Sequence, residues 1–127
     1  MSQSNSELEE KAAIMDVIAR ETDCFVQQHF DGWAACCVQD DRTREVCVSS
    51  ILGATVLEGW EMLSTYMQNV IENGATCEIS DIQRFDISIT LSGDIAHVVF
   101  SETSKHANGR VEETFETRVV ELSLIHI

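Results

Sequence analysis

The 127 residues are enough for one domain, and 44% hydrophobic with 24% charged residues is ordinary for a globular protein, which excludes a disordered or fibrous chain. A formal net charge of −14 argues against binding to nucleic acid or to an anionic membrane, since both need patches of Lys and Arg. No apolar run approaches the roughly 20 residues of a membrane span, no signal peptide is recognisable, and the five cysteines form no CxxC pair, so we expect a cytoplasmic protein with reduced thiols.

The first predicted element is a long amphipathic helix. Apolar residues recur at spacings of 3 and 4 from Ile14 to Phe25, which predicts a helix over residues 7–29. An Asp-Gly pair at 31–32 interrupts it. A short second helix is expected over residues 33–38.

The middle of the chain predicts two short strands and a third helix. β-branched residues indicate strands at 44–51 and 55–57. Gly59 precedes a helix over residues 60–72, and the Asn-Gly pair that follows is typical of a helix end.

The second half predicts a meander of antiparallel strands. Residues 85–91 alternate between apolar and polar, and strands at 95–104 and 110–121 follow, separated by turn signals. The chain is therefore predicted to be a single α+β domain over residues 1–127, in which three N-terminal helices pack on a curved antiparallel sheet.

Short motifs stand at the boundaries of this plan: residues 30–33 (FDGW), 59–61 (GWE) and 93–96 (GDIA). With their order and spacing, nearly the whole chain resembles the nuclear-transport-factor-2-like superfamily, a cone-shaped α+β fold shared by SnoaL-like cyclases and ketosteroid isomerases. Residues 66–69 (YMQN) and 116–119 (ETRV) are most similar to the association domain of calcium/calmodulin-dependent protein kinase and its stand-alone bacterial relatives. The resemblance implies a fold rather than a function, because this fold hosts enzymes, ligand binders and oligomerisation modules.

The end of the chain departs from that family, which continues through a Gly-containing turn into a last strand with Trp and His. Residues 122–127 (LSLIHI) instead resemble the translated end of a transposon-derived sequencing adaptor, which predicts that the natural last strand is missing. The alternative is a genuine short strand. In the first case, the strand at 110–121 is expected to be an unpaired edge.

Two residues are candidates for acid–base catalysis. Glu21 lies in the apolar stripe of the first helix, where burial would raise its pKa, although it could instead pair with a sheet arginine such as Arg118. His97 lies in mid-strand and could titrate near neutral pH, although a lone strand histidine is more often a packing residue. No pair of histidines stands at helical spacing with an acid, so neither a metal site nor a cofactor is expected.

The resemblance implies that Arg118 lines an internal pocket, as the matching arginine does in the kinase association domain. A companion arginine there corresponds to Glu102 here, which puts binding of the same anionic ligands in doubt. Trp33, Trp60 and Tyr66 lie where this fold lines its cavity, and their rings would favour a flat or apolar ligand. The alternative for the two tryptophans is ordinary core packing.

The Asn-Gly turn of the last hairpin leaves the strand register open. A two-residue turn places Arg118 on one face with Asp86 and His97. A three-residue turn with a glycine bulge shifts the pairing by one residue and places Arg118 beside Phe100 and Glu102.

We therefore expect a homo-oligomeric domain that binds a small apolar or aromatic ligand, with Arg118 orienting a polar or anionic end. Self-association, for example as a homodimer, is expected through the sheet. Two alternatives stay open: an isomerase, dehydratase or cyclase that uses Glu21 or His97 as proton carrier, and a pure oligomerisation module. A ketosteroid isomerase is disfavoured because residues 46–57 contain no Asp or Glu to act as its base.

Overall fold

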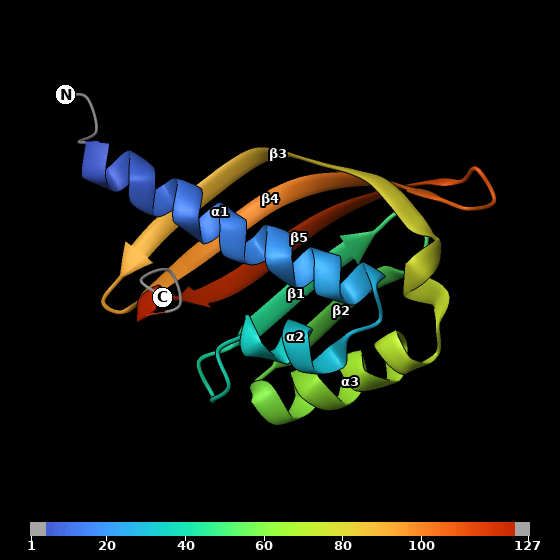
Figure 1. Cartoon of the computed structure of the whole chain (residues 1–127), viewed down its shortest axis with the longest axis horizontal. Helices are drawn as coiled ribbons and strands as arrows, with labels where there is room; N and C mark the ends of the chain where they lie inside the picture. Colours follow the sequence, from blue (N-terminus) through green and yellow to red (C-terminus); the bar gives the residue numbers. More distant parts are fainter. Residues whose placement is uncertain (1–4, 124–127) are drawn as a thin grey trace.

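The computed structural model describes residues 5–123 (Figure 1). The helices are α1 (Asn5–Val26), α2 (Phe30–Ala35), α3 (Trp60–Glu72) and the 3-10 helix η1 (Ala75–Glu78). The strands are β1 (Arg44–Ser49), β2 (Gly53–Glu58), β3 (Ile79–Ser92), β4 (Ile95–His106) and β5 (Val111–Glu121). The predicted α+β class is confirmed, and the bounds of α3 are those predicted. No helix of this part of the chain has the length and apolar character of a membrane span.

The described strands form one five-stranded antiparallel sheet in the order β2-β1-β5-β4-β3. Helix α1 runs across the inner face of the long strands, while α2 and α3 lie beside the β1–β2 hairpin (Figure 1). Two groups of buried side chains hold these layers together. One joins α1 to β4 and β5: Ile14, Val17, Ile18, Cys36, Ala96, Val98, Phe100 and Val120. The other joins α2, α3 and β2: Trp33, Ala34, Cys37, Leu57, Leu63 and Ile71.

The first helix ends before the predicted end at His29. α1 stops at Val26 because Gln28 adopts a left-handed backbone with φ 60°. The Gln28 side chain donates a hydrogen bond to the carbonyl oxygen of Ile71 at the end of α3, at 3.2 Å. The second helix then begins at Phe30, so the Asp-Gly pair lies inside α2 rather than at the break.

Strand β3 is longer than predicted and is bent. It begins at Ile79, and its register with β4 shifts at two places. Each shift contains an aspartate with a left-handed backbone, Asp81 (φ 50°) and Asp86 (φ 54°). These bulges interrupt the alternation of side chains and curve the strand over α1 (Figure 1), so the pattern failed to predict residues 79–84.

Strand β5 is not the edge that loss of a last strand was expected to leave. Its Glu116 pairs with Cys47 of β1 on one side and with Phe100 of β4 on the other. The β1–β2 hairpin therefore occupies the position that a further strand would take. Residues 124–127 lie outside the described residues, so the origin of the C-terminal hexapeptide stays a prediction.

The last hairpin adopts the three-residue-turn register. Arg118 pairs with Val98, and Gly109 has the positive φ, 85°, that a bulged turn requires. Side chains alternate along a strand, so Arg118 lies on the inner face together with Phe100 and Glu102. This register places the arginine under the helices.

One part of the sheet buries charged side chains and exposes apolar ones. Glu45 and Glu116 face inward and are buried, whereas Val48, Phe85 and Phe115 face outward and are 47%, 47% and 46% exposed. The last three residues align across the sheet through Ser101, and we call them the outer stripe. At these positions the pattern is the reverse of the ordinary one, in which the apolar face of a sheet is buried. Under α1 the inner face is ordinary, because Ala96, Val98 and Phe100 are buried there.

Candidate functional site

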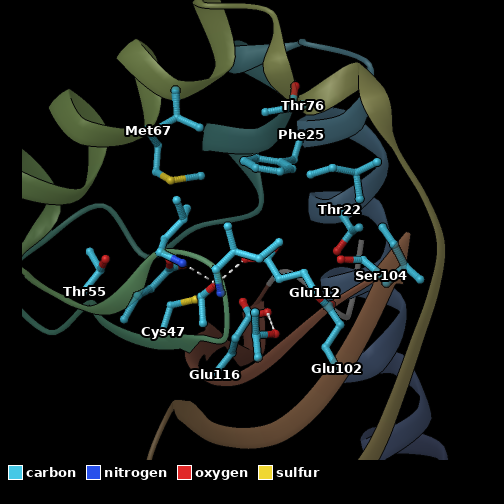
Figure 2. Close-up of a pocket in the computed structure, with 18 of the residues that line it drawn as sticks. Thr22, Phe25, Cys47, Thr55, Met67, Thr76, Glu102, Ser104, Glu112 and Glu116 are labelled. Atoms are coloured by element: carbon cyan, nitrogen blue, oxygen red, sulfur yellow. Dashed lines mark hydrogen bonds between the residues drawn. The ribbon is translucent and has the colours of Figure 1, made fainter. Parts of the chain in front are cut away.

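A cavity of about 390 Å³ lies between the inner face of the sheet and the helices. Its wall is largely apolar and includes Phe25, Trp33, Leu57, Met67, Val70 and Ile82. Figure 2 shows Phe25, Met67 and Thr76 on the helical side and Glu102 and Glu116 across the cavity from them. We call the charged side the floor: Glu21, Glu45, Arg84, Glu102, Glu116 and Arg118.

Arg118 is the centre of the floor. Its Nε donates to Glu21 Oε1 at 2.9 Å and lies 3.4 Å from Glu45 Oε1, while an Nη donates to Glu116 Oε1 at 2.6 Å. Burial alone would lower the pKa of Arg118, but the surrounding carboxylates hold it well above its ordinary value. One guanidinium thus faces three carboxyl groups, so its positive charge is already neutralised.

A second arginine lies over the same phenylalanine. The guanidinium carbons of Arg84 and Arg118 lie 5.3 and 5.6 Å from the centroid of the Phe100 ring. Arg84 also forms an ion pair with Glu102 at 3.0 Å and donates to the Thr22 hydroxyl of α1. The buried ring thus stabilises both cations through cation–π contacts.

The floor has more carboxyl groups than cations. The pKa values of these carboxyl groups therefore move in different directions. Burial raises the pKa of Glu45 to about 8, although Arg118 acts against this. Burial, with the charge and hydrogen bond of Glu116, raises the pKa of Glu102 to about 8. Burial would also raise the pKa of Glu116, but the Arg118 guanidinium and hydrogen bonds to its carboxylate lower it to about 2. Glu45 and Glu102 are therefore the groups that could exchange a proton with a ligand near neutral pH.

A polar cluster lies nearer the last hairpin. His106 Nε2 contacts Glu112 Oε1 at 3.0 Å, and the Ser49 hydroxyl donates to the other oxygen of Glu112. The Ser49 oxygen in turn accepts from the backbone N–H groups of Ile51 and Leu52. Because the serine bonds the carboxylate rather than the imidazole, this cluster lacks the arrangement of a catalytic triad.

Two buried side-chain polar atoms of the cavity lining make no hydrogen bond within the described residues: the hydroxyl of Thr76, and Nε of Arg84, which has only its ion pair with Glu102. Thr76 of η1 is 2% exposed, and its hydroxyl makes no hydrogen bond. A buried hydroxyl without a partner is destabilising by about 1–3 kcal/mol. Such an atom in a cavity wall is available for a hydrogen bond with a molecule that enters the cavity.

Four of the five predicted pocket residues line the cavity: Trp33, Tyr66, Glu102 and Arg118. Trp60 is not among the described lining residues. Its indole instead stacks on Trp33, with ring centroids 5.8 Å apart, so it acts through that neighbour.

The two predicted proton carriers have different positions. Glu21 lines the cavity and is paired with Arg118, which is the alternative considered from the sequence. His97 lies opposite Thr90 on the outer face, where it is exposed. The structure therefore does not bring His97 to the cavity, and the cluster of His97 with Arg118 does not form.

Sequence reasoning missed Arg84 and Glu45. Arg84 lies between the two bulges of β3, where alternation gives no guide. Glu45, Cys47 and Ser49 of β1 face inward. Val46 and Val48, which alternate with them, face outward. The alternation of polar and apolar residues in β1 could have identified Glu45, but only if the polar residues had been assigned to the inner face.

Cys36, Cys37 and Cys47 are not activated as nucleophiles. Burial raises the pKa of the Cys47 thiol to about 12 and also raises the pKa values of Cys36 and Cys37. These thiols therefore stay protonated and are poor nucleophiles. Within residues 5–123, no group of three or more His, Cys, Asp or Glu side chains has metal-binding geometry.

No protein-family model matches the chain, and no curated protein matches it. The structure is similar to that of a Streptomyces avermitilis protein named as a candidate dehydratase of the NTF2-like family, with 15% identity and a TM-score of 0.49, over 79% of this chain and 74% of that one. At this level the likeness says nothing about what this chain binds or does. The expected closeness to the kinase association domain stays a prediction.

Proposed function

We propose that the cavity binds a small, mainly apolar molecule whose polar end lies against the floor. The observation that carries this proposal is the apolar cavity of about 390 Å³ with charged side chains converging on one side. Ligand sites are typically of this size, and a few polar groups in an apolar wall fix the orientation of the ligand. The unpartnered Thr76 hydroxyl supports the same function.

The polar contacts differ from those expected from the sequence. Arg118 was expected to orient a polar or anionic end of the ligand; in the structure it pairs with Glu21, Glu45 and Glu116. We therefore assign the contact with the ligand to the carboxyl groups. Arg118 is a positioning residue that holds them together.

A cavity-filling substitution tests this function. Met67→Trp adds volume to the cavity wall and should weaken binding of the neutral fluorescent probe N-phenyl-1-naphthylamine by about tenfold or more, because it excludes the ligand. Met62→Trp on the same helix is the control, since Met62 is 52% exposed and should leave binding within about twofold of the original. A folded Met67→Trp protein, checked by circular dichroism, that binds the probe normally would contradict the proposal.

We propose, secondly, that the outer stripe associates with a second copy of the chain. The stripe consists of exposed Val48, Phe85 and Phe115 in the middle of the sheet, and exposed apolar area of this kind is typical of interfaces. Two copies that each carry a formal net charge of −14 repel each other, so they need an uncharged contact such as this one.

Light scattering tests this association. The measured mass in solution should be twice that of one chain. Phe115→Glu should convert the dimer to a monomer, because the substitution places like charges at the contact. Met62→Glu on α3 should leave the mass unchanged. A monomeric original protein would overturn the proposal.

A further inference from the structure

The cavity carries an excess of negative groups. The glutamates among its described lining residues are Glu21, Glu45, Glu78, Glu102, Glu112 and Glu116. Its described basic residues are Arg84, Arg118 and His106. Even with a proton held on both Glu45 and Glu102, the acidic groups outnumber the two arginines.

Each basic side chain of the cavity already has a carboxylate partner. Arg118 contacts three glutamates, Arg84 contacts Glu102, and His106 contacts Glu112. An anionic ligand would have to compete with these partners and would also be repelled by them. A cationic ligand gains attraction from the same groups.

The aromatic wall favours the same charge. Phe25, Trp33 and Tyr66 line the cavity, and the faces of such rings attract a cation when it is withdrawn from water. Figure 2 shows Phe25 on the helical side of the cavity, opposite the carboxyl groups of Glu102 and Glu116. A molecule between them contacts a ring and the acidic floor together.

An independent observation indicates that the cavity is built for a ligand with polar atoms. The Thr76 hydroxyl lies on the helical side, away from the carboxyl groups, and is buried without a partner. This hydroxyl is uncharged and is not part of the acidic floor, so the observation is independent of the excess of carboxyl groups. A ligand atom that donates to it or accepts from it would remove the cost of its burial.

We propose that the cavity selects protonated amines carried on an apolar or aromatic body. The ammonium group lies beside Glu102, whose carboxyl group releases its proton to solvent as the cation binds and then accepts a hydrogen bond as a carboxylate. The body of the ligand lies against Phe25, Trp33 and Met67. Charge-assisted hydrogen bonds of this kind are about twice as strong as neutral ones, and each N–H of the ammonium group needs an acceptor. This assignment rests on the proposed binding function and names its ligand class.

Three matched competitors test the assignment: 4-phenylbutylamine, 4-phenylbutan-1-ol and 4-phenylbutyrate, each displacing N-phenyl-1-naphthylamine at pH 7.5. They have the same number of carbon atoms and a closely similar phenylalkyl body, and they differ in the charge and hydrogen bonding of the end group. The amine should compete at least about tenfold better than the alcohol, and the carboxylate should be the weakest. Equal competition by amine and alcohol, or strongest competition by the carboxylate, overturns the amine assignment but leaves the binding function standing. If the fluorescent probe itself fails to bind, the binding function fails, and the amine assignment fails with it.

A matched pair of substitutions identifies the carboxyl group. Glu102→Gln keeps the shape of the protonated carboxyl group but cannot release a proton to become a charged acceptor, so the preference for the amine over the alcohol should fall from about tenfold to within about threefold. Glu113→Gln, one residue from the Thr114 partner of Glu102 but exposed on the outer face, should keep the full preference. If Glu102→Gln does not fold, Glu45→Gln provides the same comparison from β1. An undiminished preference in a folded floor variant overturns the role of the floor.

Discussion

Replacing Arg118 with methionine is expected to destabilise the protein by about 3–5 kcal/mol at pH 7, because it leaves buried carboxyl groups without their cation. The guanidinium contacts Glu21 at 2.9 Å and Glu116 at 2.6 Å, and these side chains are 8% and 9% exposed. A domain of this size is typically stable by about 5–15 kcal/mol, so the loss is a large share of the total. Urea unfolding followed by circular dichroism measures it.

The reference substitution for this experiment is Arg42→Met. Arg42 also contacts three carboxylates, those of Asp40, Asp94 and Glu121, but it lies at the surface. Exposed ion pairs contribute little to the free energy of unfolding, so the urea midpoint of the Arg42→Met protein should change only slightly. Equal losses of stability in the two variants would contradict the claim that burial makes the ion pairs of Arg118 more stabilising than those of Arg42.

The second large effect is a fall in stability as the pH rises from about 5 to about 8. The pKa values of Glu45 and Glu102 are raised to about 8 in the folded protein, against an ordinary value of 4.5. Between these values the folded chain holds protons that the unfolded chain has lost, so raising the pH favours unfolding by up to about 1.4 kcal/mol per pH unit for each group. Glu116 has the opposite effect, because its pKa is lowered to about 2 in the folded protein. Its contribution to stability is fully present above pH 4.5 and is lost as the pH falls towards 2.

Urea unfolding at pH 5 and pH 8 measures this dependence. Glutamine resembles a protonated carboxyl group at every pH, so Glu45→Gln combined with Glu102→Gln should remove most of the fall. The matched control is Glu113→Gln, which should retain it because Glu113 is exposed. Stability that rises steadily from pH 5 to pH 8 would contradict the raised pKa values.

The sequence predicted those elements whose pattern is local. Helix α3 was predicted at its observed bounds because a glycine precedes it and an Asn-Gly pair follows it; in the structure that glycine, Gly59, has a positive φ. The end of α1 was missed because Gln28, not a glycine, adopts the left-handed backbone there. A side-chain bond to the distant Ile71 helps to hold that conformation, and no local pattern encodes it.

The site was only partly predictable for the same reason. The pair of Glu21 and Arg118 could be proposed because one charged residue lies in an apolar stripe and the other in a strand. Their relation to Glu102 depended on the turn geometry at Gly109, which shifts every pairing of the hairpin by one residue. Glu45 was missed because β1 turns its valines outward and its polar residues inward, the reverse of the expected alternation.

The central claim is that the cavity floor holds more carboxyl groups than its arginines neutralise, so that two of them keep their protons near neutral pH. A carbon-13 NMR titration of the glutamate carboxyl groups, assigned with the Glu45→Gln, Glu102→Gln and Glu116→Gln variants, tests it directly. The account predicts that Glu45 and Glu102 titrate near pH 8 and Glu116 near pH 2. Titration of all three near their ordinary value of 4.5 would contradict it.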